Sequence, residues 1–261
     1  MPAPINNFKE ALANGQTLFG CWLSIGECST AEIMGRTGFD WLLIDGEHAP
    51  NDIRSIRDQL VALENSESQA VVRVPIGDTW IIKQVLDLGA QTILVPIVET
   101  AEQARDLVNA CRYPPNGTRG VGYGASRAGG FGQYENYGPT ADDQICLLIQ
   151  VETKLGLENL DEILDVDGVD GVFVGPADLS ASFGYLGQSS HPEMTKTILD
   201  ALKRISESGK AAGILTTEDK MTQASLEAGA RFVAVGSDVS FLINNAKATA
   251  IKWAKHRDTL V

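Results

Sequence analysis

The sequence repeats one unit: a short apolar run rich in β-branched residues, followed by a segment with helical spacing. The apolar runs are continuous rather than alternating, which is typical of strands that are buried on both faces of a parallel sheet. Eight such runs occur, at 18–25, 41–45, 70–74, 92–96, 145–151, 171–175, 211–216 and 232–236. A chain of this kind must cover both faces of its sheet with helices.

The segments between the runs predict those helices. Apolar side chains recur every three or four residues in 78–89 and 217–229, and Gly89 and Gly229 end these segments. Eight strands that alternate with helices in a chain of 261 residues have the expected length of a (β/α)₈ TIM barrel. An open doubly wound sheet is the alternative, but the G-x-G-x-x-G turn that often follows its first strand is missing from the sequence. We therefore predict one (β/α)₈ barrel domain over residues 1–261.

The connection between the fourth and fifth strands is unusually long. A helix is expected at 100–112, and the glycine-rich segment 114–140 that follows fits no periodic pattern. Long loops in compact domains often act as lids or binding loops, and a floppy insertion is the alternative. In a binding loop, Arg119, Tyr123 and Arg127 could meet an anionic ligand.

Charge and composition exclude several classes of partner. The chain has 34 acidic and 21 basic residues, a net charge of −13, which disfavours binding to nucleic acid or to an anionic membrane surface. No apolar run is long enough for a transmembrane helix, and the N-terminus lacks a secretory pattern. The four cysteines form no C-x-x-C pair, so a zinc ribbon or thioredoxin-like motif is not expected. We expect a cytoplasmic protein.

Polar residues follow the apolar runs at the ends of several predicted strands. In a barrel, the carboxyl ends of all strands meet at one rim, where the chemistry takes place. The residues expected at this rim are Asp45, Glu47, His48, Arg73, Gln150, Glu152, Asp178 and Asp238.

Glu152 and Asp178 end neighbouring strands and are expected to lie close together. Two such carboxylates repel each other, and one would protonate unless a cation lay between them. Two protein carboxylates with water and substrate oxygens commonly hold Mg²⁺ or Mn²⁺, whereas zinc more often recruits histidine or cysteine. The alternatives are that Asp178 caps the following helix, or that the two residues are a glycosidase acid–base pair.

His48 is a candidate general base, because its intrinsic pKa suits proton transfer near neutral pH. The alternative is a residue that merely leads into the next helix. A base needs a carboxylate partner, and the spacing does not choose between Asp45, Glu47 and Asp87.

Arg73 lies in an otherwise apolar strand, where a guanidinium is costly unless it is paired. It could form an ion pair with a rim carboxylate, or it could hold a substrate carboxylate or a developing oxyanion. No predicted strand contains a lysine, and Lys154 is the only nearby candidate for an imine. This favours metal-assisted chemistry over imine chemistry.

Several motifs resemble those of the HpcH/HpaI aldolase family, which are class II, metal-dependent pyruvate aldolases. The resemblance spans nearly the whole chain in the same order. Its segments are FDWLLIDGEHAP (39–50), VVRVP (71–75), LDLGAQTILVPIVETAEQAR (86–105), RYPPNGTRGVG (112–122), IQVET (149–153), DGVDGVFVGPADLSASFG (167–184) and GARFVAVGSD (229–238).

The resemblance implies a role for each candidate residue. His48 would be the general base, with Asp87 as the partner that raises its basicity, and Arg73 would stabilise an enolate.

The binding residues follow from the same resemblance. Glu152 and Asp178 would bind a divalent cation, Mg²⁺, Mn²⁺ or Co²⁺. Gln150, Asp178 and the backbone around Ala177 would contact the 2-oxo acid.

The implied reaction is reversible cleavage of a 4-hydroxy-2-oxo acid to an aldehyde and pyruvate, or a related 2-oxo acid such as hydroxypyruvate. The family is typically a hexamer, a trimer of dimers, so we expect the C-terminal helix at 239–258 to pack on a neighbouring subunit. Residues 123–137 depart from the family pattern near the aldehyde side, so the acceptor is the least transferable feature. An oxaloacetate decarboxylase, a CoA-thioester lyase and a non-catalytic 2-oxo-acid-binding protein remain alternatives.

Overall fold

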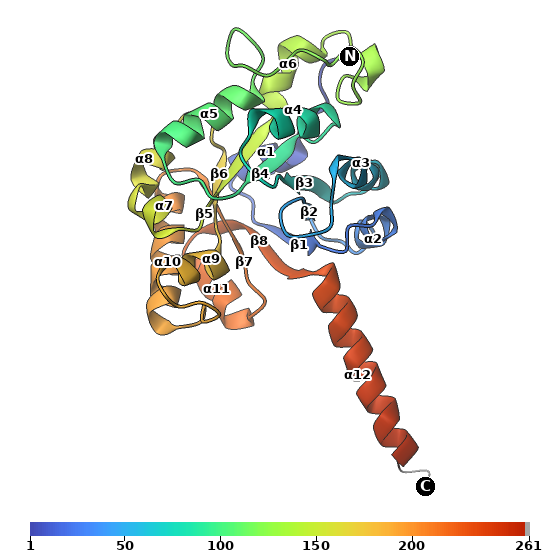
Figure 1. Ribbon diagram of the computed structural model, residues 1–261, viewed down its shortest axis with the longest axis vertical. Coiled ribbons are helices and arrows are strands. Elements are labelled where there is room, and N and C mark those ends of the chain that lie inside the picture. Colours follow the sequence, from blue (N-terminus) through green and yellow to red (C-terminus); the bar gives the residue numbers. More distant parts are fainter. Residues whose placement is uncertain (259–261) are drawn as a thin grey trace.

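The computed structural model describes residues 1–258 and contains a closed barrel of eight parallel strands in the order β1 to β8 (Figure 1). The predicted barrel is therefore confirmed, and each apolar run forms a strand. The strands are β1 (Leu18–Leu23), β2 (Trp41–Asp45), β3 (Gln69–Arg73), β4 (Thr92–Val95), β5 (Cys146–Val151), β6 (Gly171–Val174), β7 (Ala211–Leu215) and β8 (Ala230–Ser237).

Helices follow the strands and surround the barrel (Figure 1). They are α1 (Asn7–Ala13), α2 (Cys28–Met34), α3 (Ile53–Ala62), α4 (Thr79–Asp87), α5 (Ala101–Cys111), α6 (Tyr137–Gln144), α7 (Lys154–Glu158), α8 (Leu160–Leu164), α9 (Pro176–Ser182), α10 (Pro192–Glu207), α11 (Asp219–Glu227) and α12 (Asp238–Asp258), with a 3₁₀ turn η1 (Gly130–Gly132).

The barrel interior is filled by large side chains that alternate along the strands. In β2, Trp41 and Leu43 belong to the interior cluster, whereas Leu42 and Ile44 belong to the layer between sheet and helices. Phe8 of α1 belongs to the interior cluster and stacks edge-on against Trp41, with ring centroids 6.0 Å apart. Helix α1 therefore plugs the amino-terminal end of the barrel and leaves the other end for ligands.

The Trp41 ring fits only because β1 has no side chain at Gly20. A Cβ on Gly20 would lie 2.1 Å from Trp41 Cε2, closer than real Cβ contacts allow. A glycine is therefore required where the ring crosses the neighbouring strand.

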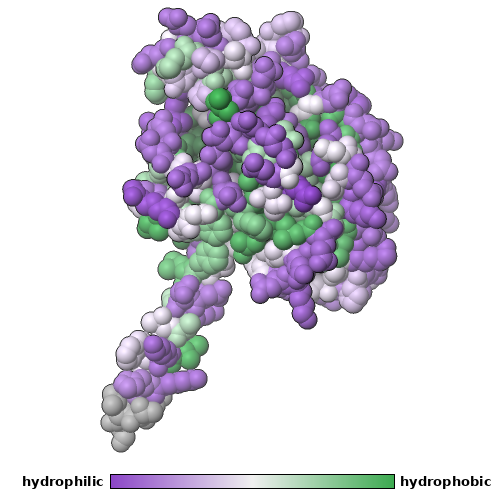
Figure 2. Space-filling model, turned by 180° about the vertical axis from the view of Figure 1, so that it is seen from behind, coloured by the Kyte–Doolittle hydropathy of each residue, from purple (hydrophilic) through white to green (hydrophobic). Residues whose placement is uncertain are grey.

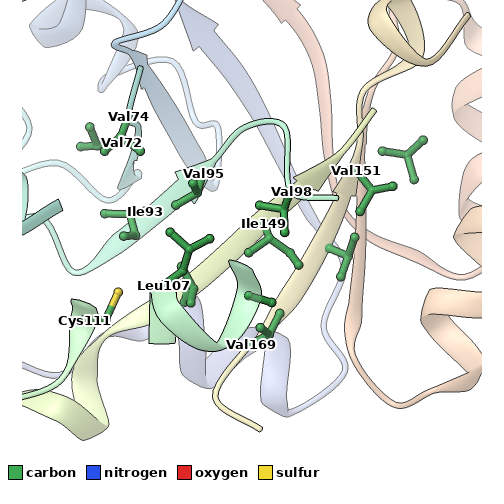
Figure 3. Packing of buried hydrophobic residues seen from close by; sticks show 14 of the residues in the cluster. Val72, Val74, Ile93, Val95, Val98, Leu107, Cys111, Ile149, Val151 and Val169 are labelled. Atoms are coloured by element: carbon green, nitrogen blue, oxygen red, sulfur yellow. The ribbon is translucent and has the colours of Figure 1, made fainter. Parts of the chain in front are cut away.

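The outer layer seals the sheet against the helices. Figure 3 shows Leu107 and Cys111 of α5 against Ile93 of β4 and Ile149 of β5. All four side chains are at least 95% buried, so this layer fixes where β4 and β5 end.

The long connection lies at the amino-terminal end of the barrel. It follows the carboxyl end of α5 and leads into the start of β5, and it contains η1 and the first residues of α6 rather than being wholly irregular. Within one chain the segment 114–140 therefore does not lie beside the rim, and its role as a lid or binding loop stays a prediction. A segment between a helix and the next strand is at the opposite end of a barrel from the chemistry.

Helix α12 projects away from the barrel (Figure 1). Its start stays attached, because Phe241 stacks on Phe39 with ring centroids 6.1 Å apart. Beyond that point Leu242, Ile251 and Trp253 are 63%, 56% and 58% exposed. Figure 2 shows hydrophobic surface on the barrel beside the place where the helix leaves.

No helix among residues 1–258 is long and apolar enough to span a membrane.

Candidate active site

Arg73 lies at the centre of the rim formed by β2 and β3. The strand register pairs it with Asp45, and its Nε and Nη2 donate to the two Asp45 carboxylate oxygens at 2.9 and 2.8 Å. Its Nη1 lies 2.7 Å from Glu47 Oε2, and its guanidinium carbon lies 5.6 Å from the centre of the Trp22 ring. The ion pair that the sequence left open is therefore present, and it joins two carboxylates rather than one.

The turn after β2 is fixed by the same aspartate. Asp45 Oδ1 accepts hydrogen bonds from the backbone N–H groups of Glu47 and His48, at 3.0 and 3.3 Å. Gly46 donates to the carbonyl of Arg73, and a Cβ at Gly46 would lie 2.6 Å from that oxygen. Only glycine fits, and the turn holds His48 at the edge of the rim.

His48 itself is largely exposed, with 65% of its side chain open to solvent. Its Nε2 lies 3.9 Å from Glu47 Oε1. Burial raises the pKa of Glu47, while the charges of Arg73 and His48 oppose that rise. Among the three predicted partners, Glu47 alone approaches the imidazole within one chain, and Asp45 contacts only its backbone.

Glu152 follows β5 and is 2% exposed. Its Oε1 accepts a hydrogen bond from the Ile97 backbone at 3.0 Å, and its Oε2 accepts one from the Gln150 amide. Burial raises the pKa of Glu152 to about 7, although both hydrogen bonds lower it and the charges of Glu47 and Asp178 raise it further. The carboxylate is therefore held in one orientation but is costly to ionise without a cation.

Asp178 lies in the first turn of α9, on the next strand–helix connection. The N-cap position is Gly175, and no side chain caps the helix, so the alternative of Asp178 as a capping residue is not supported. Its charge contributes to the raised pKa values of both Glu47 and Glu152, which indicates that it lies near them. Ala177 precedes it at the exposed start of the helix.

Asp87 is the one predicted catalytic residue that lies elsewhere. It ends α4, just before the turn into β4, and therefore lies at the amino-terminal end of the barrel. There its Oδ1 accepts a hydrogen bond from Arg119 at 3.1 Å. Within one chain, Asp87 is not the partner of His48.

The other polar residues of the long connection also bind the amino-terminal end. Arg127 donates to the Leu88 carbonyl at 3.0 Å and lies 3.4 Å from Glu64. Tyr123 packs against Tyr113 with ring centroids 5.7 Å apart. The predicted contact of these side chains with an anionic ligand cannot form at the rim of their own barrel.

Asp238 and Lys154 are the two remaining candidates, and both make structural contacts. Asp238 accepts hydrogen bonds from the backbone of Ser24 and Ile25, at 2.9 and 3.1 Å, and so closes the seam between β8 and β1. Lys154 begins α7 outside the barrel, with 62% of its side chain exposed.

No feature of the sequence points to Ile97 as a residue of the site. Its φ of +54° is rarely adopted by a β-branched residue, yet this backbone directs its N–H at Glu152. Trp22 could have been found, because a strand that alternates in and out of a barrel turns every second side chain towards the axis.

Comparisons with known proteins agree over almost the whole chain. The HpcH/HpaI aldolase/citrate lyase family matches residues 18–245. The chain is 70% identical to a hydroxypyruvate/pyruvate aldolase of Roseobacter denitrificans over 253 residues, covering 97% of this chain and 99% of the relative. It is 51% identical to a 4-hydroxy-2-oxovalerate aldolase of Rhodococcus jostii, covering 98% of each.

The fold agrees as well. A crystal structure of a family protein from Burkholderia cenocepacia superposes with a TM-score of 0.91 at 39% identity, covering 96% of this chain and 99% of that one.

Proposed function

The chain belongs to the HpcH/HpaI aldolase/citrate lyase family, and on that premise we propose how it works as a carbon–carbon lyase. It reversibly cleaves a 4-hydroxy-2-oxo acid to an aldehyde and pyruvate or hydroxypyruvate. The observation that carries this proposal is the rim, where Arg73 and the oriented carboxylate of Glu152 lie beside Asp178. Its relatives named as hydroxypyruvate/pyruvate and 4-hydroxy-2-oxovalerate aldolases support the substrate class, and the motifs also resemble those of 4-hydroxy-2-oxoheptanedioate aldolases.

Glu152 and Asp178 suit a hard divalent cation such as Mg²⁺, Mn²⁺ or Co²⁺. The donors are carboxylates, and a bound cation would favour the ionised form of buried Glu152, whose pKa is raised to about 7. Residues 1–258 contain no group of three or more His, Cys, Asp or Glu side chains arranged for a metal. With Glu152 and Asp178 as its protein ligands, a bound cation would keep positions for water and substrate. When bound, the cation supplies Lewis-acid polarisation of the 2-oxo group.

The substrate lies between these carboxylates and the guanidinium. Gln150 and the backbone of Ala177 and Asp178 orient the 2-oxo acid, and Arg73 faces the oxygen that becomes the enolate. Gln150 Oε1 is buried without a hydrogen-bond donor in the described chain, so it can accept one from a bound molecule.

His48 accepts the proton of the C4 hydroxyl, directly or through a water molecule, as the C3–C4 bond breaks. The electron pair of that bond enters the enolate, and a proton then returns to C3 to give the 2-oxo acid. In the synthetic direction the same groups remove a proton from C3.

The partner of this base comes from a second copy of the chain. The family resemblance pairs His48 with Asp87, but α4 carries Asp87 to the opposite end of the barrel. Exposed His48 and partly exposed Asp87 can therefore meet only between subunits.

Helix α12 is also expected to take part in subunit assembly. Its exposed apolar side chains include Leu242 and Trp253, and they lack a partner surface on this barrel. We propose that α12 packs on a neighbouring subunit in a homo-oligomer, a hexamer built as a trimer of dimers.

Retro-aldol assays with and without chelator test this function. Activity should disappear in EDTA and return with Mg²⁺, Mn²⁺ or Co²⁺. Activity that survives EDTA and leaves a lysine trapped by borohydride would instead show imine chemistry. Comparing the turnover of oxaloacetate with that of the aldol substrate tests the decarboxylase alternative, since decarboxylation of oxaloacetate produces the same enolate without an aldehyde.

A further inference from the structure

Arg119 is a fully buried charge in the connection between α5 and β5, with none of its side chain exposed. The guanidinium carbon lies 4.4 Å from the centre of the Tyr113 ring, and Nη2 donates to Asp87 Oδ1 at 3.1 Å. The Tyr137 side chain also interacts with the guanidinium. A buried guanidinium is costly unless it is paired, and Arg119 forms its ion pair with the Asp87 carboxylate.

Asp87 stands where helix electrostatics disfavour a carboxylate. It is the last residue of α4, and the carboxyl end of a helix carries partial negative charge. Its side chain is nevertheless 25% exposed, so the carboxylate reaches the surface while Arg119 holds one oxygen from inside. The other oxygen of the Asp87 carboxylate therefore faces outward in a fixed orientation and can accept a hydrogen bond.

We propose that Arg119 is a positioning residue for the reaction: it holds Asp87 so that the free carboxylate oxygen accepts the imidazole N–H of His48 on a second copy. This inference rests on the proposed function and on the pairing of the two residues between subunits. His48 has room for such a partner, because its imidazole is 65% exposed and only Glu47 faces it within its own chain.

The chemistry of the side chain explains why an arginine stands here. The planar guanidinium stacks on Tyr113 and so has its orientation fixed before it meets the carboxylate. A lysine could reach the same oxygen, but its flexible ammonium would not hold it in one plane.

Four variants test the role: Asp87→Asn, Arg119→Met, Arg119→Lys and the double variant Asp87→Asn with Arg119→Met. In the metal-loaded full-length enzyme, Arg119→Met should lower kcat for retro-aldol cleavage by roughly 10- to 100-fold, with KM changed less than about threefold. Arg119→Lys should recover part of that loss. In the Asp87→Asn background, Arg119→Met should cause no further loss beyond about twofold, because its effect passes through the carboxylate.

The pH profile separates positioning from folding. A neighbouring carboxylate raises the pKa of an imidazole, so the acidic limb of kcat/KM should move to lower pH by about one unit in both Asp87→Asn and Arg119→Met. Arg127→Met is the matched control, since Arg127 binds the same helix end through the Leu88 carbonyl and not through Asp87. It should leave the limb in place.

Two results would overturn the proposal: equal losses from Arg119→Met in the wild-type and Asp87→Asn backgrounds, or the same shift of the limb in Arg127→Met. A wild-type enzyme with no metal-dependent retro-aldol activity would count against the proposed function instead. If Arg119→Met does not fold, Arg119→Lys is made in both the wild-type and the Asp87→Asn backgrounds, and its loss of activity should likewise disappear in the second.

Discussion

The guanidinium of Arg73 links Asp45, the last residue of β2, to Glu47 in the turn that follows. Arg73 neutralises the buried Asp45 and the largely buried Glu47, so its removal would leave both carboxylates unpaired. The informative change is therefore Arg73→Lys, which keeps the charge. We expect kcat/KM for retro-aldol cleavage to fall by roughly 10²- to 10³-fold, because an ammonium cannot hold both carboxylates and also face the enolate oxygen.

Arg36→Lys is the control for that measurement, because Arg36 is an exposed arginine that pairs with Glu32 on α2. A value of kcat/KM within threefold of wild type in a folded Arg73→Lys enzyme would contradict the role given to Arg73.

Glu152 gives metal binding a pH dependence. Its pKa in the metal-free protein is raised from 4.5 to about 7, chiefly by burial, and a cation binds only the ionised form. Below pH 7 the proton competes, so the apparent affinity for Mn²⁺ should weaken by about tenfold per pH unit, and above pH 7 it should level off. Titration calorimetry at pH 6, 7 and 8 measures this. Equal affinity at pH 6 and pH 8 would argue that Glu152 is not a ligand.

Residue by residue, the sequence predicted types of contact better than their locations. The need of Arg73 for a carboxylate followed from its apolar strand, and the ion pair was found. The location of Asp87 could also have been read, because Gly89 ends its helix and so places it at the far end of the barrel. The left-handed backbone of Ile97 could not be predicted from the sequence, because a β-branched residue such as isoleucine disfavours that conformation.

At the scale of elements, the turn between β6 and α9 controls the carboxylate of Glu152. A Cβ at Gly175 would lie 2.4 Å from Glu152 Oε2. Gly175→Ala should therefore displace the carboxylate and weaken Mn²⁺ binding by roughly 10- to 100-fold, as do other changes that misorient a metal ligand. Calorimetry compares it with Gly124→Ala, where the new methyl group meets nothing within 4 Å. Similar affinities in the two variants would refute this dependence.

The strands could be predicted from the sequence because one rule, burial on both faces of a parallel sheet, determines their composition. Continuous apolar runs located all eight strands, since each is buried on both faces. The connection between α5 and β5 obeys no such rule, and its form depends on contacts with residues far away in sequence, such as Arg119 with Asp87.

At the scale of the whole molecule, the proposed site is shared between subunits. His48→Ala and Asp87→Asn should each strongly lower the activity of their own oligomer, but mixed oligomers contain sites with an intact His48 from one chain and an intact Asp87 from the other. Random assembly gives about a quarter of the sites both intact residues, so coexpression should restore on the order of a quarter of wild-type activity. Mixtures no more active than the separate variants would show that the pair does not form between chains.

The extended α12 also gives the protein an optical label. Of the four tryptophans, Trp22 and Trp41 are buried, while Trp80 and Trp253 are 55% and 58% exposed. Once Trp80 is replaced by phenylalanine, Trp253 is the tryptophan whose fluorescence responds to water around α12. Burial of Trp253 in a contact between subunits would shift its fluorescence emission to shorter wavelength. A shift to longer wavelength on dilution of the enzyme would therefore report that the subunits separate, from a tryptophan far from the catalytic rim.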